Sequence, residues 1–163
     1  MKWFNNPKTL EELKKQYKQL AVKHHPDKGG NTADMQEINA EYDRLFEKLK
    51  NIRRTAEGKT YTTKTETRET ANDFKEIINK LIHLDGINIE LCGLWLWITG
   101  DTFSHKETLK ALNFKWSNSK KAWYYHSDDY KKSSRKIYTL DQIRDLYGSE
   151  TITTEPQLKL TIV

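Results

Sequence analysis

A helix-breaking loop between two apolar stripes is the strongest constraint in this sequence. Apolar residues recur at helical spacing over residues 10–24, and again over residues 35–52. Between the stripes, Pro26 disfavours helical geometry in the residue before it, and the glycine pair at 29–30 continues the break. Two amphipathic stripes joined by a short loop predict an antiparallel helical hairpin, with the loop 25–30 exposed at one end.

The first predicted helix has a polar face that is unusually rich in lysine. Thr9 followed by Glu12 forms a capping box, so the helix should begin there. Residues 14–28 contain five lysines and one acidic residue, and most of these lysines fall opposite the apolar stripe. We expect them to form a solvated basic face beside the loop, either as a docking surface or as an ordinary solvated helix surface.

The loop and both flanking helices resemble a known family. LEELKKQYKQLAVKHHPDKGGN, followed by MQEINAEYDRL, is similar to the J domain of the DnaJ family, over residues 9–50. The resemblance implies a co-chaperone that docks on a DnaK-type heat-shock ATPase and stimulates its ATP hydrolysis. The docking residues that it implies are His25, Pro26, Asp27, Lys14, Lys15, Lys18, Lys23 and Lys28.

Elementary physics agrees with that assignment. Lysines on a rigid helix steer a partner, Pro26 stiffens the loop, and Asp27 offers a charge-assisted hydrogen bond. The tripeptide at 25–27 could also be a plain turn, since Pro and Asp favour turns. One departure is that the family has a short first helix before the basic one, whereas only residues 1–4 lie upstream here. Either Trp3 and Phe4 or the C-terminal unit would have to cover the exposed apolar faces.

The sequence divides the chain into a J-domain-like hairpin at 1–54, a linker at 55–72, a second unit at 73–148 and a tail. The linker is rich in Thr and charge, although an exposed strand is the alternative interpretation. The second unit should be α+β with an antiparallel sheet, in the order α, β, β, α, β, β, α. The tail at 149–163 could pair as an edge strand or remain unstructured.

The second unit concentrates aromatic and basic residues. The segment HKETLKALNFKWSNSKKAWYYH weakly resembles small Trp- and Lys-rich modules of phage and mobile-element proteins, for which DNA binding is implied. Its tryptophans could stack nucleobases or could fill the core of a small domain, and the unit could instead hold a chaperone client. The candidate nucleic-acid-binding residues are Lys110, Lys115, Trp116, Lys120, Lys121, Trp123 and Tyr125.

Composition excludes several classes of protein. The 163 residues carry a net charge of +5, and no apolar run approaches the ~20 residues needed to span a bilayer. The single cysteine, Cys92, cannot form an internal disulfide and should be buried and inert, so we expect a cytoplasmic protein.

The sequence contains no catalytic constellation, and we expect neither an enzyme nor a cofactor. His24, His25 and Asp27 lie together, but no further ligand follows at a spacing suited to a metal site. We therefore predict no metal. A protein that only makes structural interactions is the remaining alternative.

Overall fold

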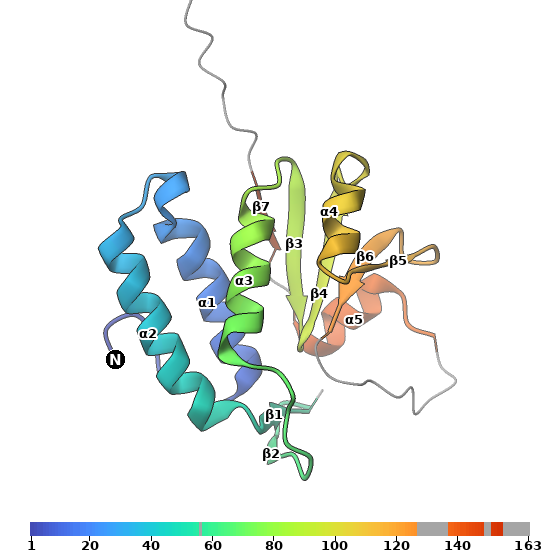
Figure 1. Cartoon of the computed structure of the whole chain (residues 1–163). Coiled ribbons are helices and arrows are strands. Elements are labelled where there is room, and N and C mark those ends of the chain that lie inside the picture. Colours follow the sequence, from blue (N-terminus) through green and yellow to red (C-terminus); the bar gives the residue numbers. More distant parts are fainter. Residues whose placement is uncertain (56, 127–136, 149–150, 155–163) are drawn as a thin grey trace, which may run out of the picture.

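The computed structural model describes residues 1–55, 57–126, 137–148 and 151–154 (Figure 1). The fold is α+β, with a helical N-terminal region and an antiparallel sheet in the C-terminal part, as the sequence predicts. The helices are α1 (Leu10–His24), α2 (Thr32–Leu49), α3 (Ala71–Ile82), α4 (Lys106–Ala111) and α5 (Leu140–Tyr147), with 3-10 turns η1 (Pro26–Lys28) and η2 (Phe103–His105). The strands are β1 (Ile52–Arg54), β2 (Thr60–Thr62), β3 (Ile87–Cys92), β4 (Trp95–Gly100), β5 (Lys115–Ser117), β6 (Ala122–Tyr125) and β7 (Thr151–Thr153). No helix in these described ranges is long and apolar enough to cross a membrane.

The helical hairpin begins and ends where the local chemistry requires. The Thr9 hydroxyl accepts a hydrogen bond from the backbone N–H of Glu12 at the start of α1. Helix α1 stops at His24 because Pro26 follows, and the Asn31 side chain caps the start of α2. The two helices pack side by side through their apolar stripes, which confirms the predicted antiparallel hairpin.

Five strands form the main sheet in the order β5-β6-β4-β3-β7, and every neighbouring pair is antiparallel. The predicted hairpin around Ser117–Lys121 is present as β5 and β6. Strand β7 pairs with β3 at one edge, so residues 151–153 adopt the edge-strand alternative for the tail. The rest of the predicted tail, at 149–150 and 155–163, lies outside the described residues, apart from Thr154.

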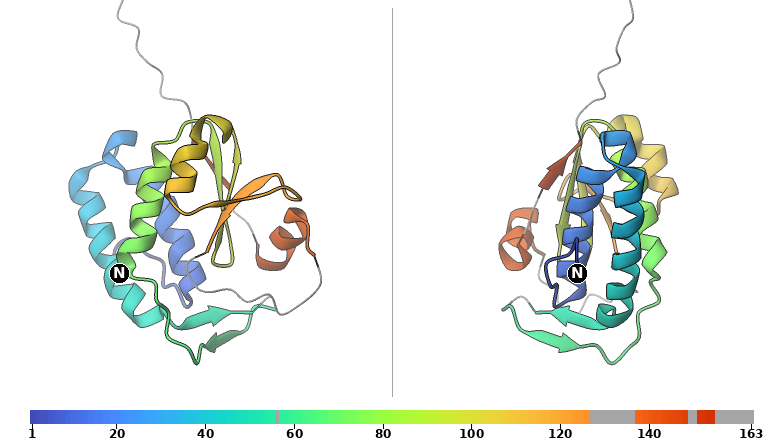
Figure 2. Two further views of the ribbon diagram at one scale, coloured as in Figure 1. Left: turned by 45° about the vertical axis from the view of Figure 1, so that its right-hand side comes forward. Right: turned by 90° about the vertical axis from the view of Figure 1, so that its left-hand side faces the viewer.

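Helices cover both faces of this sheet (Figure 2). Helices α3 and α4 lie over one face, which contributes Ile89, Ile98 and Trp123 to the main core, and α1 packs beside α3. Helix α5 lies over the other face, against Trp97 and its aromatic neighbours. Trp97 and Trp123 are therefore core residues, as one of the two interpretations of the aromatic cluster predicts. Cys92 is buried as well, in agreement with its apolar context.

One prediction about α1 is wrong, because its lysine face is not uniformly solvated. Lys14 is 2% exposed and Lys18 is 0% exposed, since α3 and strand β3 pack against the face that carries them. Both oxygens of Glu69 lie 2.6 Å from Lys14 Nζ, and both side chains are buried. Lys18 Nζ donates to the carbonyl of Ile89 in β3 at 3.4 Å. The charge pattern predicted that α1 would bury one apolar face and leave its lysine face in water. Instead, α1 packs against other elements on two of its faces.

The segment expected to be a linker carries part of this interface. Its strand β2 pairs with β1 as a small hairpin, which is the exposed-strand alternative. Further along, Glu69 turns inward to meet Lys14 just before Thr70 caps α3. The two sequence units also share one continuous cluster of buried side chains, so they pack against each other.

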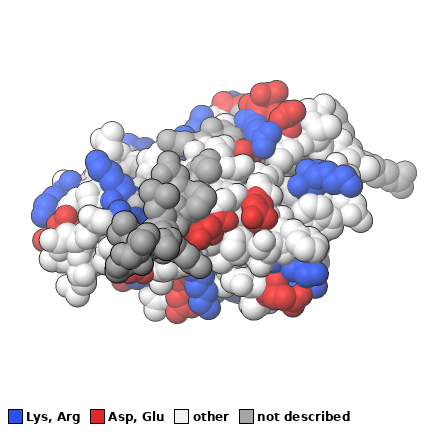
Figure 3. Space-filling view, turned by 90° about the horizontal axis from the view of Figure 1, so that it is seen from above, with Lys and Arg blue, Asp and Glu red and all other residues white. Residues whose placement is uncertain are grey.

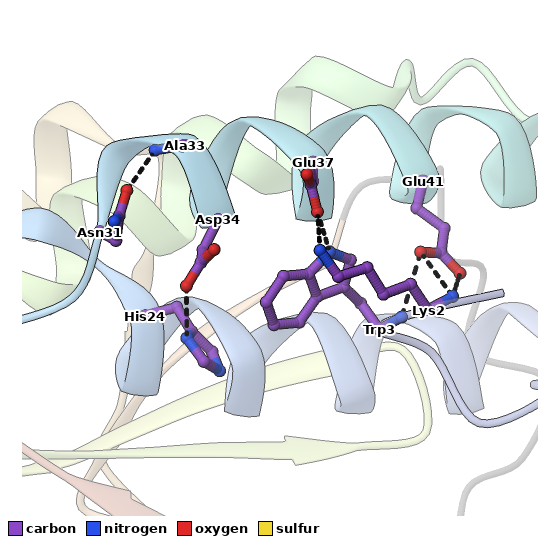
Figure 4. A network of polar contacts seen from close by, with 8 residues as sticks. All are labelled: Lys2, Trp3, His24, Asn31, Ala33, Asp34, Glu37 and Glu41. Atoms are coloured by element: carbon purple, nitrogen blue, oxygen red, sulfur yellow. Dashed lines mark hydrogen bonds and ion pairs between the residues drawn. The ribbon is translucent and has the colours of Figure 1, made fainter.

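The N-terminal segment and α3 together cover apolar faces of the helical hairpin, so both of the alternatives offered by the sequence apply. Residues 1–8 form no helix, but Phe4 is buried beside Tyr42 of α2. The backbone N–H groups of Lys2 and Trp3 donate to the Glu41 carboxylate, which ties the segment across α2 (Figure 4). On the other side, Phe74 of α3 packs against the rings of Tyr17 and Tyr42.

We expect Lys14→Ala to lower the free energy of unfolding by about 3–5 kcal/mol, because it leaves the buried Glu69 carboxylate without its lysine. Replacing both partners by Met and Leu should recover most of the loss, since apolar residues satisfy a buried volume without charge. Urea unfolding, monitored by circular dichroism, measures the free energy of unfolding of both variants. Lys48→Ala, at an exposed position of α2, is the control. A loss no larger than that of the control would contradict the role of the ion pair.

Candidate functional site

The loop 25–30 lies at one end of the helical hairpin, where the sequence predicts it. Pro26 and Asp27 are exposed in η1, and His25 is half-buried at its start. Gly29 has a φ of 88°, which favours glycine, and a Cβ on Gly30 would lie 2.0 Å from the carbonyl oxygen of His24. The two glycines therefore allow α2 to return directly against α1.

The His25 ring organises the loop and also contacts α3. Its Nδ1 accepts a hydrogen bond from the backbone N–H of Asp27 at 3.2 Å, which caps η1. Its Nε2 lies 2.5 Å from the Oδ1 of Asn79. An amide oxygen only accepts, so this nitrogen carries the hydrogen. The loop is thereby joined to α3, an element more than fifty residues further along the chain.

A second contact joins Asp27 to His83, directly after α3. Asp27 Oδ2 contacts His83 Nε2, while His83 Nδ1 lies 2.7 Å from the backbone oxygen of Asn79. The hydrogen bond that the ring donates to Asp27, and then the one to the backbone oxygen of Asn79, raise the pKa of the His83 ring above its ordinary 6.5. The same contact with His83 lowers the pKa of the Asp27 carboxyl below its ordinary 3.8. The two groups therefore stabilise each other's charged forms.

The predicted basic docking residues divide into two sets. Lys15 and Lys23 are exposed and Lys28 is half-buried, so these three are accessible to a partner. Lys14 and Lys18 are buried in the interface with the C-terminal part and do not reach the surface. Seen from the end that carries η1, positive and negative side chains are interspersed with wide uncharged areas (Figure 3).

The candidate nucleic-acid residues do not form one surface either. Lys110, Lys115 and Lys121 are exposed, and Trp116 is 43% exposed with its Nε1 donating to Asn118. Trp123 is 8% exposed and belongs to the main core, so it cannot stack on a base. This is a correction to the prediction.

Strand geometry explains the division. Neighbouring residues of a strand point to opposite faces, so Trp123 points toward the layer of α3 and α4, while Ala122 and Tyr124 point toward α5. Tyr125 is half-buried against Phe114. Lys120, also half-buried, holds its Nζ 5.8 Å from the centre of the Trp97 ring.

Sequence reasoning missed three residues that matter at the loop and its interface: Glu69, Asn79 and His83. Asn79 and His83 are four residues apart, so they lie on one side of α3 and could have been noticed as a polar pair beside its apolar stripe. Nothing in their spacing predicts that they face the loop.

No protein-family model, no curated protein and no solved structure matches this chain.

In metal-free protein we expect the His83 ring to titrate above 6.5, and Asp27→Asn to return its midpoint toward that value. The His83 contribution to stability is complete below 6.5 and is lost as pH rises through its raised pKa. The Asp27 contribution is complete above 3.8 and is lost as pH falls through its lowered pKa. The pair should therefore be strongest between pH 3.8 and 6.5.

NMR of the imidazole resonances, with a chelator present, measures the midpoint. His105, whose Nε2 contacts the carbonyl oxygen of Asp85, is the internal reference and should not respond to Asp27→Asn. An unchanged His83 midpoint in the variant would contradict the contact.

Proposed function

We propose that this chain is a J-domain-like co-chaperone that docks on a DnaK-type ATPase and stimulates its ATP hydrolysis. The observation that supports it best is the His25-Pro26-Asp27 loop, held at the exposed end of an antiparallel helical hairpin. The sequence around the loop resembles the DnaJ family, and the hairpin has the arrangement that this resemblance implies. The sheet-containing part would then select the client or target.

The docking face that we propose is smaller than the one the sequence suggested. It consists of Pro26 and Asp27 with the exposed Lys15 and Lys23, and Lys28 at its edge. Such lysines increase the rate of encounter with an acidic surface and set its register, rather than adding much affinity. Lys14 and Lys18 are excluded because they are buried. We propose a cytoplasmic setting, which suits a chain whose one cysteine is buried and reduced.

The test is the ATPase rate of a DnaK-type chaperone with and without the full chain. We expect stimulation by the wild-type protein and a return to the basal rate with His25→Gln, because Gln cannot reproduce the ring that caps η1 and faces Asn79. The half-buried His126 packs against Trp95 on the far side of the sheet, so His126→Gln is the matched control and should stimulate normally.

Circular dichroism should show the same helix content in all three proteins. Absence of stimulation by the wild type with chaperones from several sources would overturn the proposal. Equal stimulation by the wild type and His25→Gln would show that the loop does not act in the way that the resemblance implies.

A second candidate function is nucleic-acid binding, and one observation favours it. Trp116 is 43% exposed on the β5 strand, between the exposed Lys115 and a turn that carries the exposed Lys121. An exposed indole beside lysines can stack on a base while the lysines neutralise phosphate.

If this second function holds, Trp116→Ala should weaken binding of a fluorescent single-stranded oligonucleotide by about 5- to 150-fold, which corresponds to about 1–3 kcal/mol for one lost stack. Binding should also fall steeply with salt. Tyr61→Ala, at an equally exposed aromatic on β2, is the control. No salt-sensitive binding, or equal losses in both variants, would contradict the idea.

A further inference from the structure

Three side chains able to ligate a metal ion converge where the loop meets the end of α3. His25, Asp27 and His83 each offer one ligand atom, and these atoms all lie within 4.8 Å of one another. His25 Nδ1 is 3.8 Å from Asp27 Oδ2, and His83 Nε2 contacts the same oxygen. His25 and Asp27 lie two residues apart in the sequence, and the fold brings His83 to them.

Asn79 orients both imidazole rings. Its side-chain oxygen faces His25 Nε2 at 2.5 Å, and its backbone oxygen faces His83 Nδ1 at 2.7 Å. Both oxygens only accept, so each ring donates its outer N–H to Asn79. The inner nitrogens, His25 Nδ1 and His83 Nε2, then face Asp27. Histidines that bind metals are held in this way, with the second nitrogen donating to a carbonyl or carboxylate.

The contact between His83 Nε2 and the Asp27 carboxylate requires a positive charge. A neutral His83 ring with Nδ1–H would direct the lone pair of Nε2 at a carboxylate oxygen, and two acceptors repel. Either a proton on Nε2 or a cation between the two atoms removes this repulsion. Lys28 is a positive group that acts electrostatically on both His83 and Asp27.

We propose that His25, Asp27 and His83, oriented by Asn79, bind a divalent transition-metal cation of the Zn²⁺ class. Two imidazoles and one carboxylate suit Zn²⁺ or Co²⁺, whereas Ca²⁺ and Mg²⁺ prefer oxygen ligands alone. Three protein ligands leave a fourth position for water or for a group from another molecule.

Binding requires only small movements. Ligand atoms of a tetrahedral site with bonds of about 2.0–2.1 Å lie roughly 3.3 Å apart, so His83 and Asp27 must separate slightly. Their side chains are 41% and 55% exposed and are therefore able to move. The 3.2 Å hydrogen bond from the Asp27 N–H to His25 Nδ1 is the contact that the ion would replace. The bound ion would then fasten the loop to α3.

Titration of the chelator-stripped full chain with Zn²⁺ alone, followed by calorimetry, tests the site without any chaperone. We expect one ion per chain, and a visible absorption band of tetrahedral Co²⁺ when Co²⁺ replaces Zn²⁺. His83→Ala should weaken binding at least tenfold, and Asn79→Ala by about 10- to 100-fold, as for other residues that orient metal ligands. His105→Ala removes a histidine outside the cluster and should leave the affinity unchanged.

Zn²⁺ should also raise the melting temperature of the wild type, since a ligand that binds only the folded state stabilises it, and should not raise that of His83→Ala. The exposed position of His83 keeps this variant folded, and circular dichroism checks that. No stoichiometric binding by the wild type would overturn the site, and so would equal affinity in His83→Ala. Neither result depends on ATPase stimulation, so the site and the proposed function fail separately.

Discussion

The buried ion pair between Lys14 and Glu69 is the interaction on which the arrangement of this protein depends. Both side chains are almost inaccessible, and both oxygens of the carboxylate lie 2.6 Å from the ammonium group. A charge in such a place is tolerated only with a partner, so the segment before α3 must approach α1 at this position. The pair therefore sets where α3 begins, and Lys18 adds a second polar contact to β3.

The two ends of α3 contact different parts of the helical hairpin. Near its start, Phe74 packs on Tyr17 and Tyr42 and covers the apolar face of the helical hairpin. At its end, Asn79 and His83 reach the loop between α1 and α2. Helix α3 thus connects the sheet-containing part to the candidate docking loop, so any partner that shifts α3 also acts on the loop.

Periodicity predicted most of this fold, and for a clear reason. The apolar stripes of α1 and α2, the capping residue Thr9 and the break at Pro26 are local signals, and each produced the expected element. The strands of the sheet followed from alternation in the same way, and Thr and Tyr indicated the strand alternative for the linker. Local patterns report which residues are apolar, and that is enough to place helices and strands.

The same patterns could not show what covers a polar face. Lysines opposite an apolar stripe usually lie in water, but the resemblance to a basic docking helix could not reveal that Glu69 and strand β3 would cover two of them. For Trp123 the sequence left base stacking and core packing open, because alternation along a strand does not show that helices cover both faces of the sheet. Both outcomes depend on contacts between residues far apart in sequence.

The loop itself illustrates how chemistry and position combine. His25 and Asp27 are local features of the sequence, but what they can do depends on Asn79 and His83, which the fold brings to them. A partner that binds the Asp27 carboxylate must compete with His83, and one that binds the His25 ring must compete with Asn79. Docking of the kind proposed above would require these contacts with α3 to open, so the C-terminal part would then control access to the loop.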